Sequence, residues 1–144
     1  MLELRKEVII GIDLAGKPEN PTGLVLWKNK TVKTSIVYGD NEILEGITHS
    51  KPAIIAIDAP FSLPKSGIFR KADKEMIRRG YRVFPPTLSA MKKLTMRAME
   101  MNKSLAEKGY QTIEVHPTST CKALNIPQKD WGKVQTALTQ IGLK

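Results

Sequence analysis

Three acidic residues stand at the ends of strand-like runs rich in isoleucine and valine: Asp13, Asp58 and Glu114. Short apolar runs of this kind are typical of buried strands in a sheet that is covered on both faces. Burying an unpaired carboxylate is costly, so we expect these acids at the rim of the sheet, where ligands bind in such folds.

Carboxylates gathered at neighbouring strand ends supply the hard oxygen ligands that Mg²⁺ and Mn²⁺ prefer. Adjacent strands lie about 4.8 Å apart, which would let Asp13 and Asp58 share a cation, with Glu114 as a third ligand. Two such cations about 3.5–4 Å apart activate water and stabilise the leaving oxygen in phosphodiester hydrolysis. We therefore predict all three acids as catalytic, metal-binding residues. The alternative is that the two aspartates cap turns through their side chains.

The charge of the 144-residue chain is strongly positive and unevenly distributed. The net charge is +9, and ten basic residues between Lys65 and Arg97 face two acids there, a net +8. Such clustering is typical of a phosphate-binding face, so nucleic acid is the expected partner and an anionic small molecule the next. The predicted phosphate-binding residues are Arg70, Asp73, Lys74, Arg78 and Arg79. For Arg70 and Asp73, one helical turn apart, the alternative is a local ion pair.

A histidine and a glycine-containing hairpin could also take part in the chemistry. His116, just after Glu114, is either a general base or metal ligand, or a structural residue at a strand end. The segment 11–16 with Thr22 and Gly23 would also suit a phosphate-binding hairpin. That hairpin is the basis for an alternative function as a small-molecule phosphohydrolase or phosphotransferase.

The elements that must position these residues alternate in type along the chain. Strands are expected at 8–13, 22–27, 31–37, 54–58 and 112–115, and helices at 41–49, 72–79, 87–108, 118–124 and from 127 onward. Short connections make the first three strands an antiparallel meander, and a helical crossover places strand 54–58 parallel to strand 8–13. The predicted class is α/β: a ribonuclease H-like three-layer fold, with a mixed five-stranded sheet covered by helices, in one domain over residues 1–144.

Local signals add detail to the expected helices. Asp40 is a plausible N-cap for helix 41–49, and Pro127 is expected to open the last helix. Helix 72–79 should direct Ala72, Met76 and Ile77 inward. The last helix has one apolar face formed by Trp131, Val134, Leu138 and Ile141. Phe84-Pro85-Pro86 indicates a rigid turn.

Composition excludes several classes of protein. One cysteine, Cys121, excludes an internal disulfide and a cysteine-based zinc cluster. No apolar run approaches the ~20 residues that span a bilayer, and the first seven residues lack a signal-peptide core. We expect a cytoplasmic protein without a membrane partner, either a monomer or a homodimer.

Short motifs spread along the chain resemble the family called domain of unknown function 429. They include Gly11-Ile12-Asp13-Leu14-Ala15, Ala56-Ile57-Asp58-Ala59-Pro60, Arg70-Lys71-Ala72-Asp73 and Ile113-Glu114-Val115-His116-Pro117. Members are described as predicted nucleases of ribonuclease H-like fold, so the resemblance implies that fold and a metal-dependent nuclease. Members typically continue into a further helix with an acidic residue, so we expect this chain to be a shortened member, a fragment or the product of a gene cut short. A non-catalytic nucleic-acid-binding domain on the same scaffold is the alternative that such shortening favours.

Overall fold

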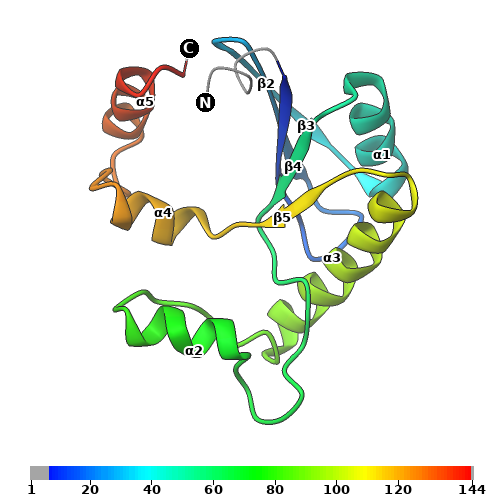
Figure 1. Cartoon of the computed structure of the whole chain (residues 1–144), viewed down its shortest axis with the longest axis vertical. Coiled ribbons are helices and arrows are strands. Elements are labelled where there is room, and N and C mark those ends of the chain that lie inside the picture. The colour runs from blue at the N-terminus through cyan, green and yellow to red at the C-terminus, as the bar shows by residue number, and fades with distance from the viewer. Residues whose placement is uncertain (1–6, 144) are drawn as a thin grey trace.

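The computed structural model describes residues 7–143, which form a five-stranded sheet with helices on its two sides (Figure 1). The strands are β1 (Val8–Asp13), β2 (Thr22–Lys28), β3 (Thr31–Val37), β4 (Ile54–Ile57) and β5 (Thr112–Glu114). Their order in the sheet is β3-β2-β1-β4-β5. The first three strands pair antiparallel, whereas β4 runs parallel to β1 and β5 parallel to β4. The predicted mixed sheet is therefore confirmed.

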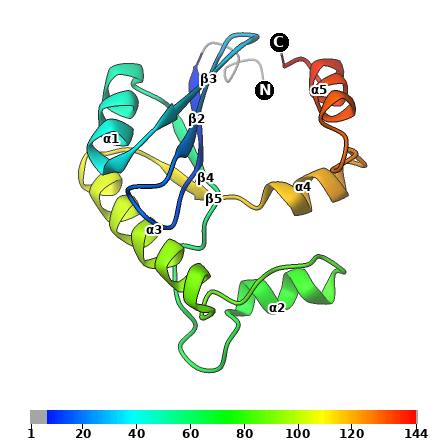
Figure 2. The same ribbon diagram turned by 180° about the vertical axis from the view of Figure 1, so that it is seen from behind.

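The five helices divide between the two sides of the sheet and its end. They are α1 (Gly39–Ser50), α2 (Lys71–Arg78), α3 (Ser89–Glu107), α4 (Pro117–Ala123) and α5 (Trp131–Gln140). Figures 1 and 2 place α1 and α3 together on one side, α4 and α5 on the other, and α2 beyond the strand ends. No helix within residues 7–143 has the length and apolar character needed to cross a membrane.

The hydrophobic core lies between the sheet and the helices α1 and α3. Alternate strand residues point to one face, and those of β1 and β4 on the core side are isoleucines. The helices contribute residues spaced three or four apart. The buried set comprises Ile10 and Ile12 of β1, Ile55 and Ile57 of β4, Ile43 and Ile47 of α1, and Ala98, Met101 and Leu105 of α3. This packing holds β1 and β4 against one rigid support.

Arg97 of α3 joins three parts of the molecule. Its guanidinium donates from Nε and Nη2 to Oδ1 of Asp40 at 3.0 and 2.8 Å, and from Nη1 to the carbonyl of Ala15 at 2.6 Å. The side chain is only 7% exposed. The backbone N–H of Ala15 in turn donates to the hydroxyl of buried Thr22 at 3.1 Å. The segment that leaves β1 after Asp13 is thus fixed from two directions.

Three of the local expectations were wrong. Asp40 lies inside the first turn of α1, whose N-cap is Tyr38, and its carboxylate pairs with Arg97 instead. Arg97 is consequently buried and does not contribute to an exposed basic face. The buried residue of α2 is the acid Asp73, whereas Ala72 and Ile77 are exposed. The ion pair of Arg97 with Asp40 joins residues 57 positions apart and overrides what local spacing indicates. Asp73 is buried instead by its short-range pair with Arg70, which also binds Glu114.

The final helix also differs from expectation. It begins at Trp131, after Asp130, whose carboxylate accepts the backbone N–H of Lys133 at 3.1 Å, and not at Pro127. None of its residues is buried, and Trp131 is 80% exposed. The apolar spacing correctly indicates a helix, but its apolar face does not join the core of the described structure.

Replacing Arg97 with methionine should lower the free energy of unfolding by about 2–3 kcal/mol. The substitution leaves the carboxylate of Asp40 and the carbonyl of Ala15 without their donors at a partly buried position. Urea denaturation measures the change. Lys92→Met, at an exposed position of the same helix, is the control and should stay within about 0.5 kcal/mol of the wild type. Equal stability of the two variants would contradict a structural role for Arg97.

Candidate functional site

Asp13 and Asp58 lie at the carboxyl ends of two adjacent parallel strands. The register pairs Ile12 with Ile57, and the N–H of Asp58 donates to the carbonyl of Ile12 at 2.9 Å. Strand pairing therefore continues up to the two aspartates. Both side chains line one cavity of about 510 Å³. The structure thus brings these two predicted site residues together at one edge of the sheet.

A small residue on the neighbouring strand leaves space beside the first aspartate. Gly23 of β2 pairs with Asp13 across the antiparallel ladder. A Cβ atom added to Gly23 would lie 3.4 Å from the Cβ of Asp13, which is a tight contact. A larger residue at this position would therefore press on the base of the Asp13 side chain.

The two aspartates repel each other electrostatically. Burial raises the pKa of Asp58 above its ordinary value, and the negative charge of Asp13 raises it further. His116 acts in the opposite direction, but its effect is the smallest of the three. A pair of like charges held by the backbone favours the binding of a proton or a cation, either of which removes the repulsion.

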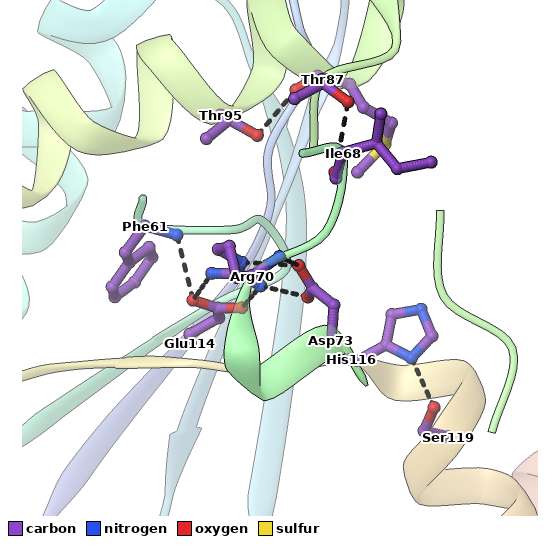
Figure 3. A network of polar contacts seen from close by, with 10 residues as sticks. Phe61, Ile68, Arg70, Asp73, Thr87, Thr95, Glu114, His116 and Ser119 are labelled. Atoms are coloured by element: carbon purple, nitrogen blue, oxygen red, sulfur yellow. Dashed lines mark hydrogen bonds and ion pairs between the residues drawn. The ribbon is translucent and has the colours of Figure 1, made fainter. Parts of the chain in front are cut away.

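Arg70 binds two acidic residues, Asp73 three residues later in the chain and Glu114 at the end of β5 (Figure 3). It donates from Nη1 and Nη2 to the two carboxylate oxygens of Glu114 at 2.9 and 2.7 Å. It also donates from Nε and Nη2 to Asp73 at 2.9 and 2.7 Å. A guanidinium has five N–H donors, so these contacts leave one of them, on Nη1, without a partner among residues 7–143. The N–H of Phe61 adds a third bond to Glu114, at 3.0 Å.

The same contacts explain why an acid is the buried residue of α2. Asp73 is the third residue of the helix and accepts the backbone N–H of Arg70 at 2.9 Å, as in a capping box. Burial alone would raise the pKa of Asp73, but the hydrogen bonds from Arg70 and its positive charge outweigh burial and lower it. Asp73 is therefore a charged, fully partnered residue that anchors the start of α2.

These contacts define what the predicted residues do within the structure. Glu114 reaches the same edge as the aspartates, because it pairs with Ile57 in the sheet, but Arg70 engages both of its oxygens. Arg70, Asp73 and Glu114 all line the cavity. A metal-binding role for Glu114 and a phosphate-binding role for Arg70 stay predictions.

The remaining predicted basic residues lie outside the cavity lining. Lys74, Arg78 and Arg79 are exposed on α2. Arg78 pairs with Glu75 at 2.6 Å and Arg79 pairs with the same carboxylate at 2.8 Å. These hydrogen bonds lower the pKa of Glu75 to about 2. The group carries a net positive charge, and it flanks the site because Asp73 and Met76 of the same helix line the cavity.

His116 faces the cavity from the segment after β5. Its Nδ1 lies 2.5 Å from the hydroxyl of buried Ser119 in α4, which fixes the orientation of the ring (Figure 3). It lines the same cavity as Asp58 and Asp73, and a positive charge on its ring would lower the pKa of both acids. The sequence analysis did not identify Ser119 as the partner of His116. The signal is a serine three residues after a histidine at the start of a helix, where the two side chains can contact each other.

Sequence reasoning also missed the apolar part of the cavity. Its lining includes Met76, Val83, Phe84, Met91 and Leu94. The sequence patterns assign these residues to a turn and to the inner faces of helices. Only the 70% exposure of Phe84, which requires coordinates, shows that an aromatic ring stands open to solvent beside the site.

The oxygen donors of the site fit a hard divalent cation. Within residues 7–143, no three His, Cys, Asp or Glu side chains are arranged to enclose a metal ion. Asp13 and Asp58 do, however, form a pair of neighbouring carboxylates. Mg²⁺ is commonly bound by one or two carboxylates while it keeps several waters, so this pair is a sufficient protein contribution.

Comparison with known proteins supports the fold. Residues 11–133 match the family described as "Protein of unknown function (DUF429)". Among solved structures, RuvC of T. thermophilus in complex with a Holliday junction substrate is similar, with a TM-score of 0.57 and 15% identity. The alignment covers 96% of this chain and 80% of that chain. No curated protein matches the sequence. At this identity the likeness shows a shared ribonuclease H-like fold.

Asp58→Asn should raise the thermal unfolding midpoint at pH 7 by about 1–3 °C, because it removes a negative charge that burial and the repulsion from Asp13 both make unfavourable. Solvent screens this partly exposed pair, so the gain is small. The pKa of Asp58 is raised above 3.8 in the folded state, so the carboxyl group takes up a proton in the folded protein first as the pH falls. This protonation stabilises the wild type. The difference in unfolding midpoint between the wild type and Asp58→Asn should therefore disappear as the pH approaches 3.8. Calorimetry at pH 7 and near pH 4 measures this.

The control for Asp58→Asn is Glu19→Gln. It makes the same change in net charge at an exposed turn, and should leave the midpoint unchanged. A lower midpoint for Asp58→Asn at pH 7 would contradict the proposed repulsion between the aspartates.

Asp73→Asn should be less stable than the wild type at pH 7 by about 2 kcal/mol, because Arg70 loses a charged partner. The pKa of Asp73 is lowered, so its stabilising effect is complete above the ordinary value of 3.8 and is lost as the pH falls further. The difference between the two proteins should therefore be smaller at a pH well below 3.8 than at pH 7. Urea denaturation at both pH values measures it, with Glu100→Gln as an exposed control. A difference independent of pH would argue against the charged state of Asp73.

Proposed function

The chain belongs to the family described as "Protein of unknown function (DUF429)", and from this premise we propose that it is a metal-dependent nuclease that hydrolyses phosphodiester bonds of nucleic acid. The observation that carries the proposal is the pair Asp13 and Asp58 at the ends of adjacent parallel strands, facing one cavity. The similar RuvC structure holds a Holliday junction substrate, which supports nucleic acid as the substrate class here.

Asp13 and Asp58 would hold Mg²⁺ or Mn²⁺. Such an ion, when bound, supplies an activated water and positive charge opposite the reacting phosphate. The chain itself contributes orientation. The bond from the N–H of Asp58 to Ile12 sets the spacing of the two strand ends, while Thr22 and Arg97 fix the segment after Asp13. The raised pKa of Asp58 reflects negative charge that a divalent cation would neutralise.

Arg70 would position a phosphate with its one free N–H donor. Its other four donors are committed to Asp73 and Glu114, which hold the guanidinium plane in one orientation. Glu114 therefore supports Arg70 in this proposal, in addition to its predicted place among the metal ligands. Rigid placement of a donor reduces the entropy lost when the substrate binds.

The exposed basic residues of α2 would bind the flanking phosphates. Lys74, Arg78 and Arg79 lie on the helix whose Asp73 and Met76 face the cavity. A nucleic acid strand that reaches the cavity would pass close to this helix. Such contacts add affinity without sequence preference and weaken as salt rises.

A second candidate function is nucleic-acid binding without cleavage. The observation that favours it is the engagement of both Glu114 oxygens by Arg70, which leaves two free acids beside each other in the described cavity rather than three. Both functions use the same basic surface and differ only in the chemistry at the strand ends.

Cleavage assays with Mn²⁺ on single-stranded, duplex, hybrid and branched substrates test the proposal. The wild type should cleave at least one class. Asp13→Asn and Asp58→Asn should each reduce the rate more than about 100-fold, because changes even in the outer shell of metal sites cost 10–100-fold. Glu19→Gln, which removes an exposed acid away from the site, is the matched control and should cleave normally.

A thermal shift provides a readout that does not depend on activity. Mn²⁺ at about 100 times its dissociation constant should stabilise the wild type by about 2.7 kcal/mol, and neither aspartate variant should respond. Cleavage without metal, or cleavage undiminished in both variants, would contradict the mechanism. Salt-dependent binding with no cleavage of any class would support the second candidate instead.

A further inference from the structure

The cavity has two chemically different parts. One part is acidic and contains Asp13, Asp58, Asp73 and Glu114, with Arg70 as the one strongly basic residue in the described lining. The other part is apolar and comes from α2, the segment after it and α3; it includes Met76, Val83, Phe84, Met91 and Leu94. Hydrolysis of a phosphodiester explains the acids but gives no reason for an apolar wall.

We propose that the apolar wall binds an unpaired nucleobase stacked on Phe84, so that the substrate is nucleic acid with a single-stranded or extruded nucleotide at the site. This inference rests on the proposed function and specifies its substrate class. The phenyl ring of Phe84 lines the cavity and is 70% exposed. Exposed aromatic rings beside a nucleic-acid site are stacking platforms that accept any base.

The backbone around Phe84 holds the ring in place. The next two residues are prolines, and Pro86 is fully buried. The N–H of Leu88 donates to the carbonyl of Pro85 at 3.1 Å, and the hydroxyl of Thr87 donates to the carbonyl of Ile68 at 3.2 Å. A rigid turn of this kind presents the aromatic ring without a large loss of entropy on binding.

Charge determines which part of a nucleotide enters the apolar region. Apart from His116, the charged groups of the described lining are four acids and one arginine, a net charge of −3. The acidic lining would repel a phosphate except at the remaining donor of Arg70 or beside a bound cation at Asp13 and Asp58. A nucleobase is neutral and apolar on its faces, so it suits the wall that carries no charge.

The size of the cavity supports the same substrate class. A volume of about 510 Å³ is in the range of pockets that enclose a small ligand. A base within an intact duplex cannot enter such a space unless it is flipped out of the stack, which requires breaking its pairing and stacking. Unpaired nucleotides do not incur this cost.

Fluorescence anisotropy with a labelled thymidine oligonucleotide and a duplex of equal length tests the inference, in EDTA so that no cleavage occurs. Phe84→Ala should weaken binding of the single strand roughly tenfold and leave binding of the blunt duplex unchanged. Phe84→Trp should restore single-strand binding. Trp131→Ala removes an exposed aromatic ring of α5 that is not among the lining residues, and should have no effect.

A 2-aminopurine base in the single strand gives a second readout, because stacking quenches its fluorescence. Wild type and Phe84→Trp should quench it, and Phe84→Ala should not. Single-strand binding and quenching unchanged in Phe84→Ala would overturn the inference, and so would an equal loss of duplex binding.

The outcomes separate this inference from the proposed function. Cleavage that requires Asp13 but is indifferent to Phe84, together with unchanged binding, would reject only the base-binding wall. Binding that requires Phe84, with no cleavage in Mn²⁺, would reject only the nuclease and leave the base-binding wall in place.

Discussion

The parallel pairing of β1 with β4 is the constraint on which the site depends. It aligns Ile12 with Ile57, and the next residue on each strand is an aspartate. The core isoleucines of β1 and β4, including Ile12 and Ile57, pack against α1 and α3. A shift of one residue between the strands would turn these side chains out of the core, so the pairing is held in register. Core packing thus maintains two like charges in proximity, which is unfavourable by itself and favourable for a cation.

Arg70 extends this arrangement beyond the sheet. By binding Asp73 and Glu114 together, it connects the start of α2 to the end of β5. Burying the charges of Arg70 and Asp73 is tolerable only because nearly all their hydrogen-bonding groups are satisfied. The connection places α2 across from the strand ends, and this encloses the cavity between acids on one side and an apolar wall on the other.

Local sequence patterns predicted much of the fold, because the formation of a strand or a helix depends largely on residues that are close in the sequence. Local signals indicated a strand or helix at each of the elements in the described residues, and α3 ends at Glu107, one residue before the predicted end of helix 87–108. The same reasoning failed for Asp40 and for the inner face of α2. At Asp40, the ion pair with Arg97, 57 residues away, decided the outcome. At α2, the ion pair between Arg70 and Asp73, three residues apart, buried an acid that apolar spacing alone does not indicate.

The sequence by itself determined that Asp13, Asp58 and Glu114 end strands at one edge, because strand polarity and crossover handedness follow from the order of elements. Only the tertiary structure decided that Glu114 binds Arg70, 44 residues away, and that Phe84 borders the acids. It also decided that the apolar face of α5 stays outside the described core. The physical reason is that hydrophobic periodicity and strand ends are local properties. The partner of a charge or an apolar face depends instead on which distant segments the fold brings together.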